Sequence, residues 1–409
     1  MNKVFITGRG LVTPIGVGLQ ENEESLRSGR SGIVAVPEFV EHRLDSQVGG
    51  MVREDLSSPL LDRRALRFCP PVGLMSVIAA QEAFAEAGIP AEEVRNHRIA
   101  VVGGVAGGNY RELYEFANAY VSKGYKSRAV SPYGVPRVMP SSAVSNLSLV
   151  FGMRGESYDI SAACASSALA VIIGARLIRS GQYDMVLAGG AEQLDWVQAI
   201  GFCACRALST KYNETPSRAS RPFDRDRDGF VLAGGGAYVL LESEKSVQAR
   251  GVRPISMVSG LGANSNAVDM VVPDAAATAA VMAEAIADAG LKAADIGYVN
   301  THGTSTPVGD PIEMEAIRQV LGEKVMINST KSQTGHMVGA TGAAEIIFTS
   351  MMLEKNFISP SINLDNPDDE FAWADLVREC REGTSVRHAV SNSFAFGGSN
   401  AAVVISDCK

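Results

Sequence analysis

The sequence predicts an α/β protein built from two similar halves that pack on each other. Apolar runs of strand length alternate along the chain with helical segments, which is typical of layered α/β folds. Runs such as IAVVGG, DMVLAGG and AYVLLE are apolar throughout, as strands buried on both faces of a sheet are. With 409 residues, 46% of them hydrophobic, the chain is long enough for two packed subdomains.

A diverged internal repeat supports the division into halves. Residues 82–94 (EAFAEAGIPAEEV) resemble residues 284–296 (EAIADAGLKAADI). Both segments are predicted to be helices that end at a C′ glycine, Gly88 in one and Gly290 in the other. An apolar strand follows each of them, RIAVVGG after the first and IGYVNTHG after the second.

A weaker echo pairs ASSALAVII, residues 165–173, with ATGAAEIIF, residues 340–348. We therefore predict an N-terminal half over residues 1–250 and a C-terminal half over residues 251–409. The charged stretch SEKSVQARG near their junction is expected to form a surface helix and a connection.

The charge and hydropathy of the chain argue against two classes of protein. The net charge of −8 argues against a protein that binds nucleic acid over its whole surface. The longest apolar stretch, residues 162–178, is interrupted by Gly174 and Arg176 and is too short to span a membrane. The first residues, MNKVFITGRG, are typical of a strand and a turn rather than a signal peptide. The sequence therefore indicates a cytoplasmic protein that binds neither nucleic acid nor a membrane.

The sequence contains no metal-binding signature. No CxxC pair occurs among the six cysteines, and no nearby His or Cys completes a set of four ligands around Cys203 and Cys205. The run RPFDRDRDGFVLAGGG, residues 221–236, lacks the ligand spacing of an EF-hand and is predicted to form a salt-bridged turn. We expect no bound metal, and we expect five of the six cysteines to be ordinary thiols in a reducing compartment.

Cys164 is the candidate nucleophile. It lies in YDISAACASSALAVIIGARLI, between a predicted strand and a predicted helix with small residues in its first turn. A thiol at a helix N-terminus faces free N–H groups and the positive end of the helix dipole, which favour the thiolate. The alternative is a buried structural cysteine, which is equally compatible with this segment taken alone.

Two of the five histidines follow predicted strands and enter polar, glycine-rich loops, His302 in YVNTHGTSTPVGDP and His336 in INSTKSQTGHMVGATGAAE. Such loops on a rigid scaffold often carry function. Lys331 is either a solvated lysine or, beside a carboxylate such as Glu345, half of a buried ion pair. Glu345 lies in an Ala-rich predicted helix, where an exposed glutamate is the simpler alternative.

A predicted hairpin ends the chain. Residues 391–405, SNSFAFGGSNAAVVI, form a strand, a Phe-Gly-Gly turn and a second strand. Gly397 and Gly398 permit close approach of the backbone, whose N–H groups at such a turn can stabilise an oxyanion. A plain β-hairpin with an unusual turn is the alternative.

Together these segments resemble the elongating β-ketoacyl-[acyl carrier protein] synthases of the thiolase superfamily. The similarity runs from MNKVFITGRGLVTPIG to FGGSNAAVVI. Its most specific motifs are ACASS around Cys164, THGTSTPVGDP around His302, and KSQTGHMVGATGAAE around Lys331 and His336. The resemblance implies a thiolase-like fold with five layers, αβαβα, made of two duplicated halves.

The resemblance also implies fatty-acid chain elongation by decarboxylative Claisen condensation. Cys164 would accept the acyl group, and its own N–H with that of Phe396 would form the oxyanion hole. His302 and His336 would stabilise the malonyl thioester carbonyl as carbon dioxide leaves. Phe396 would also gate the pocket.

Further roles are implied for residues around this centre. Lys331 and Glu345 would hold the histidines in place, Thr304 and Thr306 would hydrogen-bond the phosphopantetheine arm, and Asp310 would order their loop. No cofactor is implied, since the substrates travel on the phosphopantetheine of acyl carrier protein.

Two kinds of partner follow from the resemblance. A homodimer with a continuous sheet is implied, and so is an acidic acyl carrier protein. Local basic clusters could dock that carrier on an otherwise acidic chain. The candidates are Arg63, Arg64, Arg67, Lys123, Lys126 and Arg128.

The substrate preference depends on two loops. The small-residue run GGVAGGN, residues 103–109, and the loop SNAVDMVVPDAAAT, residues 265–278, are closer to the synthases that also handle unsaturated intermediates. Ala106 and Gly107 are therefore candidates for lining the acyl pocket.

Three alternatives remain at this point. A thiolase would need a second catalytic cysteine in a late CxG segment, where this chain has FGGSN. A polyketide ketosynthase would use the same three residues. A non-catalytic carrier-binding scaffold would typically have lost the nucleophile, whereas Cys164, His302 and His336 are all present.

Overall fold

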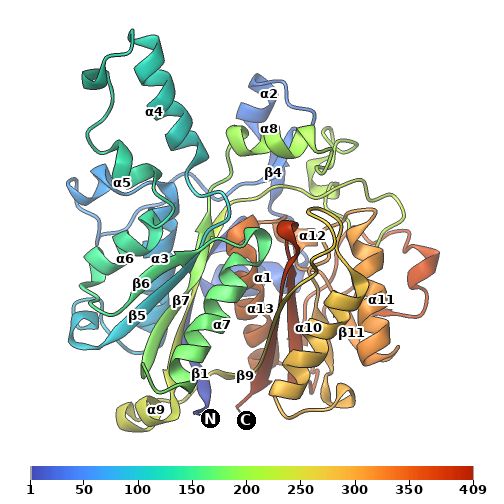
Figure 1. The fold of residues 1–409 in the computed structure, drawn as a ribbon. Coiled ribbons are helices and arrows are strands. Elements are labelled where there is room, and N and C mark those ends of the chain that lie inside the picture. The colour runs from blue at the N-terminus through green and yellow to red at the C-terminus, as the bar shows by residue number, and fades with distance from the viewer. Residues whose placement is uncertain (1, 409) are drawn as a thin grey trace.

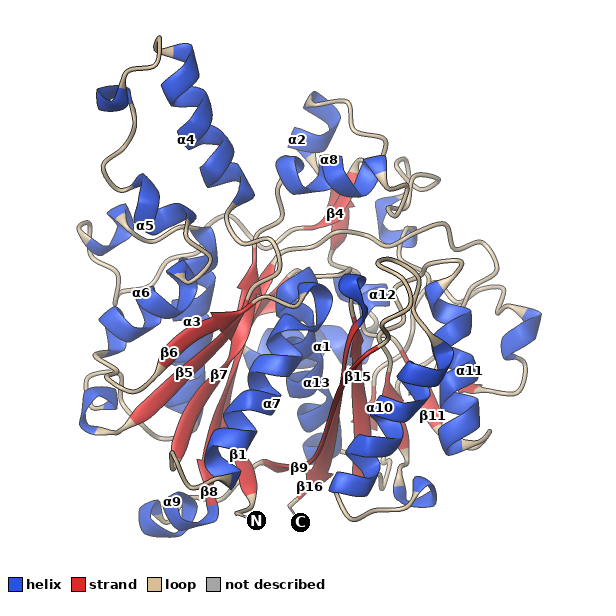
Figure 2. Ribbon diagram, in the orientation of Figure 1, coloured by secondary structure: helices blue, strands red, loops and turns tan. Residues whose placement is uncertain are grey.

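In the computed structural model, which describes residues 2–408, helices and sheet alternate in five layers (Figures 1 and 2). A 12-stranded sheet runs through the molecule as two arms that meet at one narrow junction. The arms are joined by β1 and β9 through two antiparallel pairs, Phe5 with Met257 and Ile6 with Ser256. This short junction leaves room for a layer of helices between the arms.

The N-terminal arm has the strand order β6-β5-β7-β8-β1. Its three outer strands are parallel, and β8 and β1 are antiparallel to their neighbours. The strands are β1 (Val4–Thr13), β5 (Ile99–Gly104), β6 (Ser157–Ile160), β7 (Met185–Glu192) and β8 (Gly235–Ser243).

The C-terminal arm repeats this arrangement, with the order β11-β10-β15-β16-β9 and a short β13 added outside β11. Parallel and antiparallel pairs follow in the same sequence as in the first arm. The duplication predicted from the sequence is therefore confirmed. The strands are β9 (Ser256–Ser265), β10 (Tyr298–Asn300), β11 (Met326–Asn328), β13 (Asp375–Leu376), β15 (His388–Phe394) and β16 (Ser399–Asp407).

Helices form the other three layers. The middle layer holds α7 (Ser166–Arg179) and α13 (Thr341–Lys355), which contain the two halves of the weaker sequence echo and pack on each other. The outer layers hold α3 (Pro71–Glu86) with α6 (Ser142–Phe151) on one side, and α10 (Ala275–Asp288) with α11 (Gly309–Leu321) on the other.

Each interface between layers has its own apolar core, and the strands supply two cores at once. On β16, Val403 and Ile405 enter the central core with α7 and α13, whereas Val404 enters the outer core with α10 and α11. On β8, Leu241 faces the centre and Leu240 faces α3. Successive side chains of a strand point to opposite faces, so strands covered on both sides must be apolar throughout.

The two segments with the stronger sequence similarity, residues 82–94 and 284–296, occupy equivalent places in the two halves. The helices α3 and α10 are each followed by a glycine with positive φ, 71° at Gly88 and 69° at Gly290. This left-handed conformation ends a helix most easily at glycine. The charged stretch near the junction forms α9 (Glu244–Arg250), which the Ser243 hydroxyl caps at its start and Gly251 ends.

The remaining elements lie around this framework, and α4 with the following loop projects from one end (Figure 1). None of the helices among residues 2–408 has both the length and the apolar character needed to cross a membrane. The remaining helices and strands are β2 (Gly16–Val17), α1 (Leu19–Ser28), β3 (Ile33–Ala35), α2 (Pro37–Glu41), β4 (Val48–Gly50), α4 (Tyr110–Ser122), α5 (Gly134–Val138), α8 (Trp196–Ala204), α12 (Lys331–Thr334), β12 (Phe357–Ile358) and β14 (Arg381–Glu382).

Candidate active site

A cavity of about 360 Å³ lies where the two halves meet, and residues predicted from separate sequence motifs line it together. The lining includes the candidate nucleophile, both candidate histidines, the Phe-Gly-Gly turn and the Thr-rich loop. These residues are Cys164, His302, His336, Phe396, Thr304 and Thr306.

Cys164 lies on a single 3₁₀ turn, Ala163–Ala165, between the end of β6 and the start of α7. The strand and the helix that the sequence predicts on its two sides are both present. Ala163 has φ of 46°, a left-handed conformation that is unfavourable for a residue with a Cβ. This strained turn presents the thiol to the cavity.

Burial decides the protonation of the thiol. It raises the pKa of Cys164 to about 12, although Lys331 and the N–H groups of Phe396 and Cys164 itself act in the opposite direction. The N–H groups at the helix N-terminus favour the thiolate, as the sequence suggests, but desolvation of the charged form outweighs them. The resting residue is a thiol that needs a base.

The backbone around the sulfur is arranged to receive negative charge. The N–H groups of Cys164 and Phe396 both act on the sulfur, so two backbone donors from distant parts of the chain meet at one point. Phe396 begins the turn after β15, where Gly397 has φ of 82° and donates its N–H to the Met270 carbonyl at 2.8 Å. An oxygen bonded to a carbon on the sulfur would lie near the same two donors.

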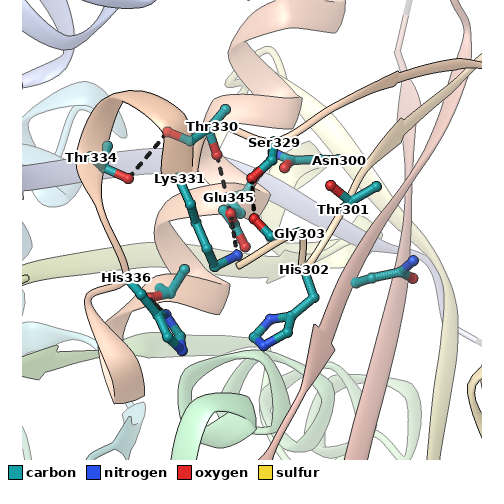
Figure 3. A network of polar contacts seen from close by, with 12 residues as sticks. Asn300, Thr301, His302, Gly303, Ser329, Thr330, Lys331, Thr334, His336 and Glu345 are labelled. Carbon is teal, nitrogen blue, oxygen red and sulfur yellow. Dashed lines mark hydrogen bonds and ion pairs between the residues drawn. The ribbon is translucent and has the colours of Figure 1, made fainter. Parts of the chain in front are cut away.

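His302 and His336 come together beside the sulfur, although 34 residues separate them in the sequence. Their ring centroids are 5.2 Å apart, and the rings are nearly perpendicular (Figure 3). One nitrogen of each ring and Sγ of Cys164 all lie within 4.8 Å of one another. His302 also meets the edge of Phe394, and His336 that of Phe230.

Both imidazoles are neutral near pH 7. Burial, together with the nearby Lys331 ammonium, holds the pKa of His302 and of His336 well below the ordinary value of 6.5. His336 Nδ1 lies 3.0 Å from the Thr341 hydroxyl, while His336 Nε2 and His302 Nδ1 are buried without a partner among the described residues. A Thr341 hydroxyl that donates to Nδ1 leaves the ring proton on Nε2, where it is available to a substrate.

Glu313, which the sequence motifs did not single out, fixes the backbone of His302. Its carboxylate on α11 accepts the N–H of His302 at 2.8 Å and that of Gly303 at 2.7 Å, and the Asn392 amide adds a third bond at 3.1 Å. Burial raises the pKa of Glu313 to about 7. This role could not be predicted from the sequence, because PIEMEAI is typical of an ordinary amphipathic helix with surface carboxylates.

Lys331 and Glu345 form a buried ion pair behind the histidines (Figure 3). Lys331 Nζ lies 2.7 Å from Glu345 Oε1, which also accepts the Thr330 hydroxyl at 3.1 Å. Each side chain is 1% exposed, so the alternatives of a solvated lysine and an exposed helix glutamate are wrong. Burial raises the pKa of Glu345 to about 7, and Lys331 opposes that rise.

Replacing Lys331 with methionine is expected to lower the free energy of unfolding by about 3–5 kcal/mol, because Glu345 is then buried without its cation. The folded variant holds a proton on Glu345 that the unfolded chain has already lost. A carboxyl pKa raised by folding gives stability at low pH that disappears as the pH rises, so the variant weakens between about pH 5 and 8.

Urea denaturation of the variant at about pH 5 and at about pH 8 checks this prediction. The double variant Lys331→Met, Glu345→Leu is expected to recover most of the lost stability, since no unpaired charge remains buried. A Lys331→Met protein as stable as the unsubstituted one at pH 8 would contradict the role assigned to the pair.

The Thr-rich loop forms one wall of the cavity. The hydroxyls of Thr304 and Thr306 lie 3.1 Å apart, and Asp310 accepts the backbone N–H groups of Ser305 and Thr306. The same carboxylate accepts the N–H of Phe223 at 3.0 Å. Asp310 therefore orders this loop and ties it to the Arg/Asp-rich segment.

That Arg/Asp-rich segment is salt-bridged, as predicted. Arg221 pairs with Asp224 at 3.0 Å, and Arg227 pairs with Asp368 at 2.9 Å. The segment leads directly to Gly229 and Phe230, which line the cavity.

The predicted basic residues all lie on the surface and outside the lining of the cavity. Arg63, Arg64 and Arg67 lie at or beside the 3₁₀ turn Ala65–Arg67, and the second cluster lies at the far end of α4. Arg206, which was not among the predicted residues, is exposed and lines the cavity beside Ala207. Arg206 follows α8 directly and has no basic neighbour in the sequence, so a search for clusters of charge does not find it.

Comparisons with known proteins agree with this geometry. The sequence model described as "Beta-ketoacyl synthase, N-terminal domain" matches residues 1–246, and "Beta-ketoacyl synthase, C-terminal domain" matches residues 255–365. The 3-oxoacyl-[acyl-carrier-protein] synthase 1 of Haemophilus influenzae is 41% identical over 99% of this chain and 98% of its own length. The synthase 1 of Escherichia coli (strain K12) is 41% identical over the full length of both chains.

Solved structures show the same fold. A β-ketoacyl synthase from Burkholderia phymatum superposes with a TM-score of 0.95 and 33% identity over 100% of both chains. A type II polyketide ketosynthase solved with its acyl-carrier protein, AntDE:AntF, superposes with a TM-score of 0.90 and 27% identity over 99% of both chains. The thiolase-like fold predicted from the sequence is confirmed.

Proposed function

This chain belongs to the β-ketoacyl synthase family, and we propose that it joins malonyl-[acyl carrier protein] to an acyl group carried on Cys164. The product is a β-ketoacyl-[acyl carrier protein], which makes the chain a condensing acyltransferase of fatty-acid elongation. The observation that carries the assignment of residues is the convergence of Sγ and two neutral imidazoles within 4.8 Å. That set supplies a nucleophile and two hydrogen-bond donors at one point.

In the first half-reaction the Cys164 sulfur attacks the carbonyl of the acyl thioester. Because the thiol is protonated at neutral pH, its proton must move to a base, and the neutral imidazoles of His302 and His336 adjoin it. The oxyanion that forms lies against the N–H groups of Cys164 and Phe396. When it collapses, the acyl group stays on Cys164 and the phosphopantetheine thiol leaves with a proton.

In the second half-reaction the malonyl thioester loses its carboxylate. The bond between the carboxylate and the α-carbon breaks, carbon dioxide leaves, and the electron pair forms an enolate. Two neutral imidazoles can donate one hydrogen bond each to the enolate oxygen. The α-carbon then attacks the acyl carbonyl, and the Cys164 thiolate leaves and takes a proton from water, since its own proton left with the phosphopantetheine thiol in the first half-reaction.

Incubation of the purified protein with octanoyl- and malonyl-carrier thioesters tests this function. We expect 3-oxodecanoyl-carrier and carbon dioxide, detected by mass spectrometry and by coupled release of the gas. Reaction with CoA thioesters but not with carrier thioesters would indicate a thiolase. Failure with both would indicate a scaffold.

The fatty-acid assignment is favoured over a polyketide ketosynthase by the degree of similarity. The relatives at 41% identity over the whole chain are 3-oxoacyl-[acyl-carrier-protein] synthases, whereas the polyketide ketosynthase AntDE:AntF is 27% identical. All three catalytic positions are occupied, which disfavours a non-catalytic scaffold.

The carrier is proposed to approach the mouth of the cavity from the side of Arg206. Arg206 is exposed and lines the cavity, and the acidic chain as a whole offers few cations to an acidic carrier. The clusters around Arg64 and Lys126 would extend this contact. The carrier complex of AntDE:AntF supports a direct encounter of this kind.

Replacing Arg206 with glutamate is expected to raise KM for the carrier thioester about tenfold and to change kcat little, because charges at the edge of an interface act mainly on encounter. The increase should shrink as salt is added. Steady-state kinetics at two ionic strengths measures both effects. Arg154→Glu, at an exposed position outside the cavity lining, serves as the control; an equal effect of the two variants would remove Arg206 from the docking surface.

A homodimer is proposed to form along β6. This strand ends the N-terminal arm of the sheet, so one of its edges meets no other strand of the described chain. An open strand edge invites pairing with another chain. Beside it on α6, Leu149 is 78% exposed, which a partner surface would cover.

The cytoplasm is the proposed location. All six cysteines are free in the structure, as expected in a reducing compartment.

A further inference from the structure

Two buried amide side chains, Asn109 and Gln198, carry polar atoms that have no hydrogen-bond partner among the described residues. Asn109 is 4% exposed, and neither its amide nitrogen nor its amide oxygen meets a partner among the described residues. Gln198 is 8% exposed, and its amide oxygen has no partner either. The mechanism of condensation uses neither residue.

These amides lie next to the loop that is expected to line the acyl pocket. Ala106 packs in the same apolar cluster as Cys164 and Phe202. A Cβ on the adjacent Gly107 would lie 2.7 Å from the amide nitrogen of Gln198, so the Gln198 side chain rests directly on this loop. Asn109 follows two residues later and begins α4, which contacts α8.

Gln198 lies on α8 about one turn before Phe202, outside the lining of the cavity. Phe202 and Cys205 line the cavity, and Phe202 faces Phe396 with 6.4 Å between ring centroids. Gln198 precedes Phe202 by four residues on the same face of the helix, which is about 6 Å further along its axis. Neither amide lines the cavity itself, so an acyl chain held on Cys164 would reach them only with its far end, by passing between the Gly107 loop and α8.

Local structure does not explain the two side chains. Asn109 occupies the N-cap position of α4, where asparagine ordinarily accepts a backbone N–H, yet its side chain makes no such bond. The backbone N–H of Gln198 is capped by Asp195 at 2.8 Å, so the side chain of Gln198 is not needed there. A buried polar group without a partner lowers stability, which favours an apolar residue at such a position unless a ligand supplies the bond.

We propose that the distal end of the acyl substrate carries a hydroxyl group that hydrogen-bonds to Asn109 and Gln198. The proposal rests on the condensing function given above and assigns the class of acyl group that the site takes. A hydroxyl both donates and accepts, which matches a set of an amide N–H donor and amide oxygen acceptors.

The charges nearby favour a neutral group over an anion. The buried Glu192 already accepts the backbone N–H groups of Ala106 at 2.9 Å, of Gly108 at 2.9 Å and of Gly339 at 3.2 Å. These donors are therefore occupied, and the second carboxylate nearby, Asp195, adds further negative character. The cation that acts on Asp195, Arg111, already pairs with Glu38 and Glu115, so a carboxylate at the end of the acyl chain would have to compete for it.

Carrier thioesters of hexanoyl, octanoyl and decanoyl groups, each paired with its ω-hydroxy counterpart, test the proposal in the acylation of Cys164. For at least one length we expect the hydroxyacyl group to react about tenfold faster in kcat/KM than its alkyl pair, since one buried hydrogen bond of about 1.4 kcal/mol corresponds to that factor. Gln198→Met and Asn109→Leu should each remove the preference. Neither variant should lower the melting temperature, because each replaces an unpartnered polar group with an apolar one of similar shape.

Gln193→Met is the matched control, because Gln193 also has an unpartnered amide oxygen but lines a groove with Met51 and Met75 instead of the cavity. It should keep the preference of the unsubstituted protein. A preference for the alkyl group at every length, or a ratio that Gln198→Met leaves unchanged, would overturn the proposal. If no thioester acylates Cys164 at all, the condensing function fails as well, whereas equal rates for both members of each pair overturn only the hydroxyl preference.

Discussion

Replacing Cys164 with alanine is expected to lower the rate of β-ketoacyl formation at least about 10³-fold, because the variant loses the thiol that lies beside the two histidines and carries the acyl chain. The residue lies on a surface turn of the cavity, so the loss of one sulfur atom should leave the fold intact. Steady-state production of 3-oxoacyl-carrier measures the loss. Circular dichroism confirms the fold.

Cys205→Ala is the control for this experiment. Cys205 lines the same cavity but is exposed on the last turn of α8. We expect its removal to change the rate less than twofold. A large loss in Cys205→Ala, or substantial activity in Cys164→Ala, would contradict the assignment of the nucleophile.

Replacing His302 or His336 with alanine is expected to lower elongation by about 10²–10³-fold, because each removes one hydrogen bond to the enolate in a buried site. Acylation of Cys164 should slow as well, because the imidazoles adjoin the thiol that must lose its proton, but it should slow less than condensation, since the oxyanion hole consists of backbone groups. The double variant should be little slower than the worse single variant, as expected for residues that act together. Single-turnover experiments separate acyl transfer from the release of carbon dioxide.

The control is His388→Ala. His388 is the first residue of β15 and does not line the cavity. It is partly buried, and its ring lies within hydrogen-bond distance of Ser406 on β16. It should retain nearly full activity. Loss of acylation and condensation to the same extent in His302→Ala and His336→Ala would show that the pair positions the nucleophile rather than the enolate.

Most of the fold could be predicted from the sequence because duplication leaves two independent signals of the same structure. The helix ends at Gly88 and Gly290 and the apolar strands after them recur in both halves. The pairing of β1 with β9, which joins the two arms, leaves no such signal, because it consists of two residue pairs.

The side chains that meet in the cavity could also be predicted, but their electrostatics could not. Cys164, His302 and His336 follow strand ends in recognisable motifs, whereas the rise in the Cys164 pKa comes from burial by residues distant in sequence. The same is true of Glu313 and of the pair of Lys331 with Glu345. A carboxylate in an Ala-rich or amphipathic helix looks solvated until the layer that covers it is known.

Intact mass of the protein after mixing with octanoyl-carrier thioester tests the central claim most directly. The account predicts a gain of one octanoyl group per chain, located by peptide mapping to the peptide that contains Cys164 and absent from Cys164→Ser. An adduct on another residue, or no adduct with a correctly folded protein, would contradict it.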